Sequence, residues 1–327
     1  MKKFLKLKTY SFLAIVFLFA VSCNNDDDDN TPTPSQTITD LVISNQNLSN
    51  LLAALQAADG DLPTVLRGTG PFTVLAPTDT AFEAFLDGRE LTDIPTDVLT
   101  QVLLNHVIAG AITSTDLEAN VAAGNYYAKT LADGQAEGSN MSIYYDTENG
   151  VTFNGTSTVT TANVVADNGI IHVVNSVIDL PTVVTFATAD NRFSTLVSAL
   201  TREASFGYVA ALSTADGTAP APFTVFAPTN DAFGDLLTDL GVSGLGDIET
   251  ATLATVLELH VIAGSNVQAS ELAGIDGMMV ETLGGTNITI DASTPGIIGT
   301  DETVNPIIIT DVQASNGIIH AISRVIR

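Results

Sequence analysis

The sequence is poor in cysteine, tryptophan and positive charge, and each shortage argues against a class of function. One Cys in 327 residues excludes an internal disulfide and a cysteine-based metal cluster. Trp is absent and aromatic residues make up 6%, which leaves little material for stacking nucleic-acid bases. Lys and Arg number 11 against 37 Asp and Glu, a formal charge of −26, so phosphate backbones and anionic membranes are repelled. The 45% hydrophobic content is nevertheless that of a globular protein, and the length allows two domains.

The N-terminus has the pattern of a cleaved leader. Four lysines precede an apolar run of ten residues at 12–21, and a bilayer-spanning helix needs about 20. The chain's one cysteine, Cys23, directly follows Ala20-Val21-Ser22. This resembles a bacterial lipoprotein signal, which implies that residues 1–22 are removed and Cys23 is acylated, holding the protein to a membrane. An ordinary secretory signal with an incidental cysteine is the alternative. Removal of residues 1–22 would leave a net charge of −30.

Residues 23–35 are predicted to be a solvated tether. After Cys23 the segment contains no apolar residue, and it combines Asp26–Asp29 with Thr31–Ser35, which alternates with proline. An acidic run behind a lipidated cysteine resembles the surface-export signals of Bacteroidetes-type lipoproteins, and a merely solvating spacer is the alternative. The resemblance implies an outer-membrane lipoprotein at the cell surface.

The rest of the chain is an internal duplication. Three sequence blocks recur in the same order and at nearly constant spacing. The pairs of blocks are 71–82 with 222–233, 106–110 with 260–264, and 168–172 with 316–320. We therefore expect two domains, a first repeat at residues 36–181 and a second repeat at 182–327. The join at Asp179–Thr182 is short, which favours close neighbours.

Apolar spacing predicts helices in the first half of each repeat. Leucines at 48, 51, 52 and 55 follow the helical i, i+3, i+4, i+7 pattern, and residues 193–200 repeat it. The run 72–75 predicts a short strand ended by Pro77. Thr78 or Asp79 should then cap a helix that buries Phe82 and Phe85. In the second repeat, Thr229 or Asn230 should cap the helix that buries Phe233.

A further helical stripe leads into a histidine in each repeat. Its apolar residues precede His106 and His260, and we expect these helices to stop near Gly110 and Gly264, which can take the left-handed cap conformation. The second half of each repeat is rich in Val, Ile and Thr and contains Asn-Gly turns, which is typical of strands and hairpins. Helices followed by strands indicate an α+β fold.

These blocks resemble the fasciclin-like domain family over nearly the whole mature chain. Its first signature is similar to residues 73–82 and 224–233, and its last to 168–178 and 316–326. Its middle Tyr-His block matches at His106 and His260, although Asn105 and Leu259 replace the usual tyrosine. The resemblance implies a compact β-wedge with attached helices. It also implies an adhesive role, in which the domains bind extracellular or envelope proteins or polysaccharides.

The resemblance further implies a candidate ligand-binding position. In some animal members, an Asp-Ile pair just before the last signature contributes to receptor binding. The matching positions are Asn163 and Val164 in the first repeat, and Asp311 and Val312 in the second. Only Asp311 retains the carboxylate, and an animal receptor is not an expected partner of a bacterial protein.

The residues suited to catalysis are more simply interpreted as structural. All four histidines, His106, His172, His260 and His320, fall in duplicated blocks, and with Phe82 and Phe233 they are interpreted as motif residues of the core. Zinc-ligand spacing and the Gly-x-Ser-x-Gly nucleophile pattern are both missing. We therefore expect no catalytic residue, no metal and no cofactor.

The leading hypothesis is a lipid-anchored adhesion or binding module. Two tandem domains raise avidity where both can engage a partner at once. A scaffold facing the periplasm is the second hypothesis, and an enzyme acting on polysaccharide is the third.

Overall fold

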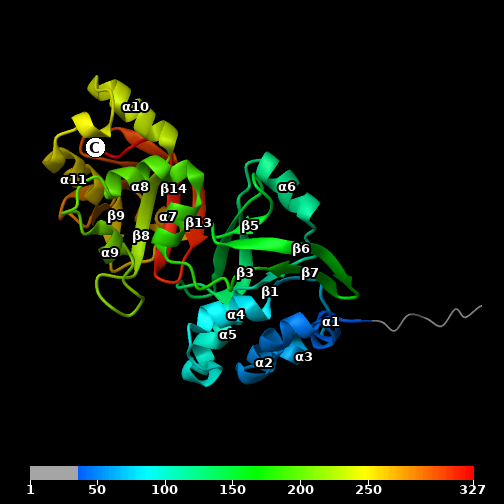
Figure 1. Ribbon diagram of the computed structural model, residues 1–327. Coiled ribbons are helices and arrows are strands. Elements are labelled where there is room, and N and C mark those ends of the chain that lie inside the picture. Colours follow the sequence, from blue (N-terminus) through cyan, green and yellow to red (C-terminus); the bar gives the residue numbers. More distant parts are fainter. Residues whose placement is uncertain (1–35) are drawn as a thin grey trace, which may run out of the picture. The chain divides into compact units, whose positions relative to one another are not determined.

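The computed structural model describes residues 36–327, which form one compact unit (Figure 1). The predicted leader, Cys23 and the tether lie outside the described residues. Both repeats mix helices with strands, which confirms the α+β class. The helices of the first repeat are α1 (Ile38–Ser44), α2 (Ser49–Ala57), α3 (Leu62–Val65), α4 (Asp79–Leu86), α5 (Thr96–Leu104) and α6 (Ser114–Ala122). Its strands are β1 (Phe72–Pro77), β2 (Val107–Ala109), β3 (Tyr127–Asp133), β4 (Asn140–Asp146), β5 (Thr152–Phe153), β6 (Ser157–Ala166) and β7 (Gly169–Val174).

The second repeat follows the same order of elements. Its helices are α7 (Val183–Ala189), α8 (Ser194–Leu200), α9 (Tyr208–Leu212), α10 (Asn230–Leu240), α11 (Thr250–Leu259) and α12 (Ala269–Leu272). Its strands are β8 (Phe223–Pro228), β9 (Val261–Ala263), β10 (Met279–Glu281), β11 (Asn287–Asp291), β12 (Gly296–Ile298), β13 (Val304–Gln313) and β14 (Gly317–Ile322). Short 3-10 turns precede α2 and α8, as η1 (Gln46–Leu48) and η3 (Asn191–Phe193).

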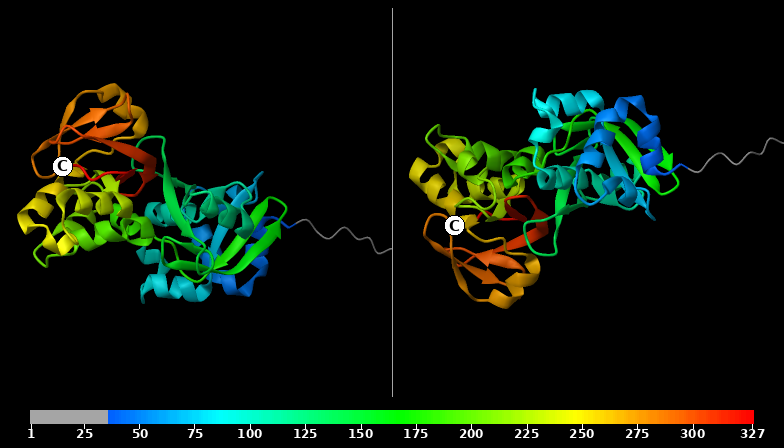
Figure 2. Two further views of the ribbon diagram at one scale, coloured as in Figure 1. Left: turned by 90° about the horizontal axis from the view of Figure 1, so that it is seen from above. Right: turned by 90° about the horizontal axis from the view of Figure 1, so that it is seen from below.

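The three duplicated blocks meet as three neighbouring strands. In the first repeat β1 pairs in parallel with β7 and antiparallel with β2, and in the second β8 pairs in the same way with β14 and β9. The sheet of the first repeat closes in the order β1 to β7, whereas that of the second is open, in the order β10-β11-β12-β13-β14-β8-β9. Figure 2 shows β10–β12, in orange, on one side of red β14 and the green-to-yellow helices on the other. Residues that are far apart in sequence therefore lie side by side in each sheet.

Threonines begin the helices that follow β1 and β8. The Thr78 hydroxyl accepts a hydrogen bond from the Ala81 N–H, and Thr229 does the same at α10. The neighbouring Asp79 instead accepts from Ser49 Oγ and the Asn50 N–H, so it ties α4 to α2. The sequence left the choice of cap open, and the structure assigns it to the threonine in both repeats.

The predicted glycine ends of α5 and α11 are wrong. These helices end at Leu104 and Leu259, and the Val-Ile-Ala that follows each histidine is a strand. This run forms a strand and not a helix end because it is apolar and partly β-branched and pairs with the edge of β1 or β8. Gly110, at φ +102°, therefore follows a strand and caps no helix.

Each repeat has its own apolar core beneath the helices. Phe82 and Phe233 are both 1% exposed and anchor α4 and α10, whereas Phe85 is only partly buried. The main core of the second repeat also takes in Tyr144 of the first. The two repeats therefore share buried surface.

A buried ion pair and three tyrosines join the repeats. Asp190 is 1% exposed and accepts from the Tyr127 hydroxyl at 2.8 Å and from Arg192 at 2.6 Å. The Arg192 guanidinium lies 4.3 Å from the centre of the Tyr126 ring, a cation–π distance. Tyr144 packs against the ring of Tyr127. These aromatic rings exclude water around the carboxylate.

Strands β4 and β13 continue this contact. The Gln313 N–H donates to Ser142 Oγ at 2.9 Å, and Lys129 Nζ donates to the Asp311 carbonyl at 2.6 Å. Burial lowers the pKa of Lys129. We call this surface the junction: β3 and β4 of the first repeat against α7, η3 and β13 of the second.

Candidate functional site

The histidines that follow α5 and α11 hydrogen-bond to the backbone through both ring nitrogens. His106 Nδ1 lies 2.7 Å from the Val102 carbonyl, and its Nε2 accepts from the Ile178 N–H at 2.8 Å. His260 repeats this with Val256 and Ile326. Because Nε2 accepts a hydrogen bond, the ring proton is on Nδ1 and the imidazole is neutral. Burial lowers the pKa of each ring to about 4.

The second histidine pair is bound in the opposite tautomer. His172 Nε2 lies 2.9 Å from the Ile112 carbonyl, and its Nδ1 faces the Asn163 N–H at 3.4 Å. His320 does the same with Val267 and Asp311. Burial is the main cause that lowers the pKa of both rings. No histidine ring nitrogen is left for a substrate, and within residues 36–327 no three His, Cys, Asp or Glu side chains group to hold a metal ion.

Asn168 and Asn316 do more than form the predicted turns. The Asn168 side chain accepts from the Ile38 N–H and donates to the carbonyls of Leu66 and Gly68. Asn316 makes the same three bonds in the second repeat, to the N–H of Val183 and two carbonyls at the end of α9. One amide thus fastens the first and third helices of each repeat to the sheet. The exact recurrence of Asn-Gly-Ile-Ile-His was the available signal for this role.

The glycines that follow these asparagines are required by close packing. A Cβ on Gly169 would clash with the Phe72 carbonyl oxygen, and one on Gly317 would clash with that of Phe223. The contact arises because β7 and β14 begin directly beside the start of β1 and β8. The Asn-Gly pair is therefore a packing motif as well as a turn.

The candidate ligand-binding pairs lie on bulges in β6 and β13. Asn163 and Asp311 both have φ +59°, and each side chain accepts from the first N–H of the helix beside it, Ser114 in α6 and Ala269 in α12. The aspartate position therefore supports a helix N-terminus in both repeats.

The two pairs differ in exposure. Asn163 is exposed and Val164 half-buried. In the second repeat the junction covers the pair, because Asp311 is half-buried and Val312 is 3% exposed in a core that includes Tyr144. A partner can therefore reach the first pair far more readily than the second.

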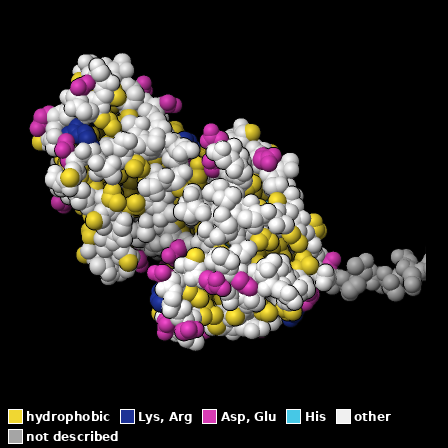
Figure 3. Space-filling model, viewed as in Figure 1, with side chains coloured by type: hydrophobic (Ala, Val, Ile, Leu, Met, Phe, Trp, Pro, Cys, Tyr) yellow, Lys and Arg dark blue, Asp and Glu magenta, His cyan; other side chains and the backbone are white. Residues whose placement is uncertain are grey.

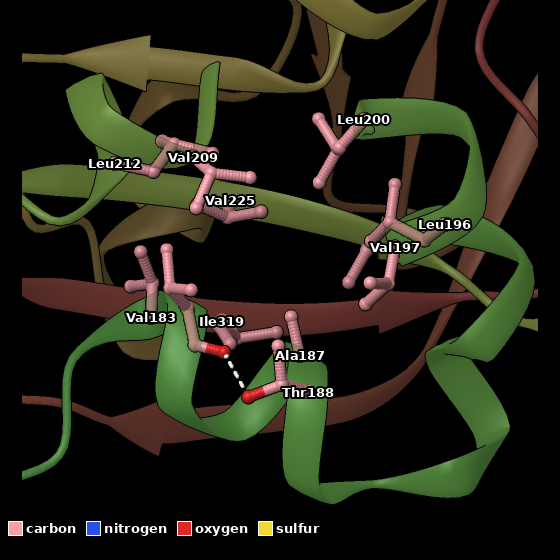
Figure 4. A pocket seen from close by; sticks show the side chains of 12 residues that line it. Val183, Ala187, Thr188, Leu196, Val197, Leu200, Val209, Leu212, Val225 and Ile319 are labelled. Carbon is pink, nitrogen blue, oxygen red and sulfur yellow. Dashed lines mark hydrogen bonds between the residues drawn. The ribbon is translucent and has the colours of Figure 1, made fainter. Parts of the chain in front are cut away.

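An apolar pocket opens among the helices of the second repeat (Figure 4). It measures about 440 Å³, including the part open to solvent, and lies between α7, α8 and α9 above β8 and β14. Its one polar side chain, Thr188, donates to the Val184 carbonyl within α7. The lining therefore offers a ligand almost entirely apolar contact.

A wider cleft lies between α10, α11 and the C-terminus. It measures about 760 Å³ including open solvent, and it brings Arg327 beside the apolar side chains of Leu240 and Val256. The guanidinium is already paired with Asp239 and Asp301. These carboxylates leave it little charge to offer an anion.

Most of the charged side chains on the surface are acidic. Figure 3 shows many Asp and Glu side chains and few Lys or Arg on the face in view. Within residues 36–327, no helix is long and apolar enough to cross a bilayer.

The Fasciclin domain family model matches twice, at residues 46–181 and at 191–327. The chain belongs to the fasciclin domain family. Domains of this family are typically adhesion or binding modules, and the two matches show a tandem pair. Two relatives from Synechocystis sp., each described as a protein without a functional name, are 40% and 35% identical to this fasciclin chain over 147 residues. Those matches cover 45% and 44% of it and 98% and 73% of the relatives.

Longer relatives match both fasciclin repeats at lower identity. Human periostin is 26% identical over 78% of this chain, and the porcine transforming growth factor-beta-induced protein ig-h3 is 28% identical over 80%. The matches span 27% and 34% of those two proteins. A FAS1 domain pair from the insect cell adhesion molecule fasciclin I has a similar structure, with a TM-score of 0.52 at 19% identity. The match covers 85% of this chain and 96% of the insect pair, and it supports the fasciclin fold alone.

Proposed function

We propose that the chain is a non-catalytic adhesion or binding module held at the outer membrane by an acylated Cys23. It engages extracellular or envelope proteins or polysaccharides through two tandem domains, residues 36–181 and 182–327. The acidic segment at 26–29 and the prolines behind it give the domains reach from the membrane.

The match of the fasciclin family to both repeats carries this proposal. The duplicated residues support this proposal, because their polar groups already form hydrogen bonds within the fold. Both ring nitrogens of His106 face backbone atoms, and so do those of its three counterparts. Specificity is then left to exposed surface that differs between the repeats.

The exposed bulge on β6 is the favoured contact surface. Asn163 is exposed and Val164 half-buried, whereas in the second repeat Asp311 is half-buried and the junction covers Val312. We infer that the first repeat makes the principal contact at this position. A polar Asn and a short apolar side chain suit a neutral surface better than a cationic receptor loop.

A binding screen with matched variants tests the proposal. The purified protein is immobilised and exposed to matrix proteins, polysaccharides and whole cells. Asn163→Ala should weaken capture, whereas Asp311→Ala should not. The two changes remove equivalent helix-supporting side chains, so they cost similar stability. The proposal fails if no protein, polysaccharide or cell is retained, and the contact surface is wrong if both variants bind like the original protein.

A further inference from the structure

The junction consists of two complementary surfaces, and each repeat contains the strands that build both of them. One surface, the platform, comprises β3 and β4 with Tyr126, Tyr127 and Ser142. The other, the docking face, comprises the β13 bulge through Gln313 together with Asp190 of η3. The platform of the first repeat binds the docking face of the second. The docking face of the first repeat and the platform of the second take no part in the junction.

The unused docking face lies on β6. Asn163 and Asp311 occupy equivalent bulges, with the same φ and the same bond to a helix start. Two residues further on, Val165 therefore matches Gln313. Gln313 is 1% exposed in the junction, whereas Val165 is 75% exposed.

The unused platform lies on β10 and β11. Counting back from the Thr-Leu pairs at 130 and 282, Met278 and Met279 match Tyr126 and Tyr127. Asn287 pairs with Glu281 as Ser142 pairs with Lys129, so Asn287 matches Ser142. Met278 and Met279 are 54% and 73% exposed. With Val165 they are the three most exposed large apolar side chains among the described residues.

We propose that a second copy of this chain docks head-to-tail, with β10 and β11 of one chain against β6 of the next. The contact repeats the junction between molecules, and because its two surfaces differ it continues from chain to chain. Flexible methionines suit such a surface, since they adapt to the partner's shape. This inference rests on the β6 contact surface of the proposed function and assigns a second copy of the chain to it. The tests below measure self-association only, so their failure is distinct from a failure of the proposed function.

Three features make this contact weaker than the junction. Asn45 precedes η1 where Asp190 precedes η3, so the buried carboxylate of the junction has no counterpart on the docking face of the first repeat. Glu281 stands where Lys129 contacts a carbonyl, so that bond is lost. The net charge of −26 also repels a second copy at low salt. Salt shortens the screening length to about 8 Å at 0.15 M. Association should therefore grow with both protein concentration and ionic strength.

Cysteine cross-linking tests the geometry. Residues 36–327 form one compact unit without Cys23, so single cysteines can be placed at Val165→Cys in one protein and Asn287→Cys in another. The template is the 2.9 Å contact between the Gln313 N–H and Ser142 Oγ. Under mild oxidation the mixture should give a disulfide-linked heterodimer in excess over either protein alone. Val98→Cys, exposed on α5, replaces Val165→Cys as the control. Cross-linking no greater than in that control overturns the proposal.

Sedimentation of the same unit gives a second measurement. The unmodified unit should associate as concentration and salt rise. Val165→Asp should raise the apparent dissociation constant of self-association about tenfold, because it places an unpaired charge in an apolar contact. Val98→Asp should leave association unchanged. A unit that stays monomeric at high salt contradicts the proposal and leaves the two faces to a different protein.

Discussion

The duplicated polar residues of this chain form hydrogen bonds that join its helices, strands and loops to one another. His106 joins the end of α5 to Ile178, 72 residues further on, and Asn168 joins α1 and α3 to the sheet. Each bond satisfies a buried backbone group that would otherwise cost about 1–3 kcal/mol. The histidines were interpreted from the sequence as hydrogen-bonded residues on apolar stripes. Their partners were not predictable, because Ile178 and Ile326 become neighbours only when the sheet is complete.

The buried histidines predict a loss of stability in acid. The pKa of His106 and of His260 is about 4 in the folded protein and about 6.5 when unfolded. Below pH 6.5 the unfolded chain takes up protons that the folded chain refuses until about pH 4. The free energy of unfolding therefore falls as the pH falls through this window, by up to about 3 kcal/mol for each ring.

Nuclear magnetic resonance checks this directly. The ring protons of His106 and His260 should show no titration between pH 7 and 5 in the folded protein. Rings that titrate near pH 6.5 without unfolding would contradict their burial and the tautomer assigned here.

At the scale of elements, the close approach of the Asn-Gly pairs to the neighbouring strand makes a glycine prediction. Gly317→Ala should destabilise the protein severely, because the new Cβ would clash with the Phe223 carbonyl oxygen. Gly234→Ala is the matched control: it lies in α10 with open space around it, and should stabilise by about 0.5–1 kcal/mol. Urea unfolding of both variants measures the difference. Equal midpoints would show that β14 does not start against β8.

The phenylalanine on α4 should dominate the packing of that helix. Phe82→Ala removes a side chain that is 1% exposed and should cost about 3–5 kcal/mol by leaving a cavity. Phe85→Ala, on the same helix but only partly buried, should cost clearly less. Chemical denaturation of both variants tests the orientation of the helix. A larger loss for Phe85→Ala would mean that α4 is rotated about its axis.

Sequence patterns predicted the helices better than the strands of the duplicated blocks. The leucine stripe at 48–55 and the threonine caps gave α2, α4 and their counterparts, because both signals are local. The run after His106 was assigned to a helix end, yet it forms β2, since its pairing partner β1 lies more than thirty residues earlier. Parallel pairing of β1 with β7 depends on still more distant residues.

At the scale of the whole molecule, the junction ties the two repeats into one unit. It was not predictable, because Tyr127, Asp190 and Arg192 lie outside the duplicated blocks. Copies of one domain can be found by comparing a sequence with itself, whereas the contact between them depends on the residues in which they differ. The same difference exposes the bulge at Asn163 and covers the one at Asp311.

Breaking the junction should uncouple the repeats. Asp190→Ala leaves Arg192 and the Tyr127 hydroxyl without their carboxylate, and should cost about 2–4 kcal/mol. Asp239→Ala removes an exposed carboxylate that pairs with two arginines and should cost about 1 kcal/mol or less. Calorimetry should show one transition for the original protein and for Asp239→Ala, and two for Asp190→Ala. A single unchanged transition in Asp190→Ala would show that the junction contributes nothing.

The central claim is that two fasciclin domains are presented from the membrane by an acylated Cys23. The most direct measurement is protease shaving of intact cells after metabolic acyl labelling, with Cys23→Ser as the control. We predict a labelled protein that the protease removes, and no label in Cys23→Ser. An unlabelled protein would contradict the anchor, and a labelled protein protected from the protease would contradict surface display and favour a scaffold facing the periplasm.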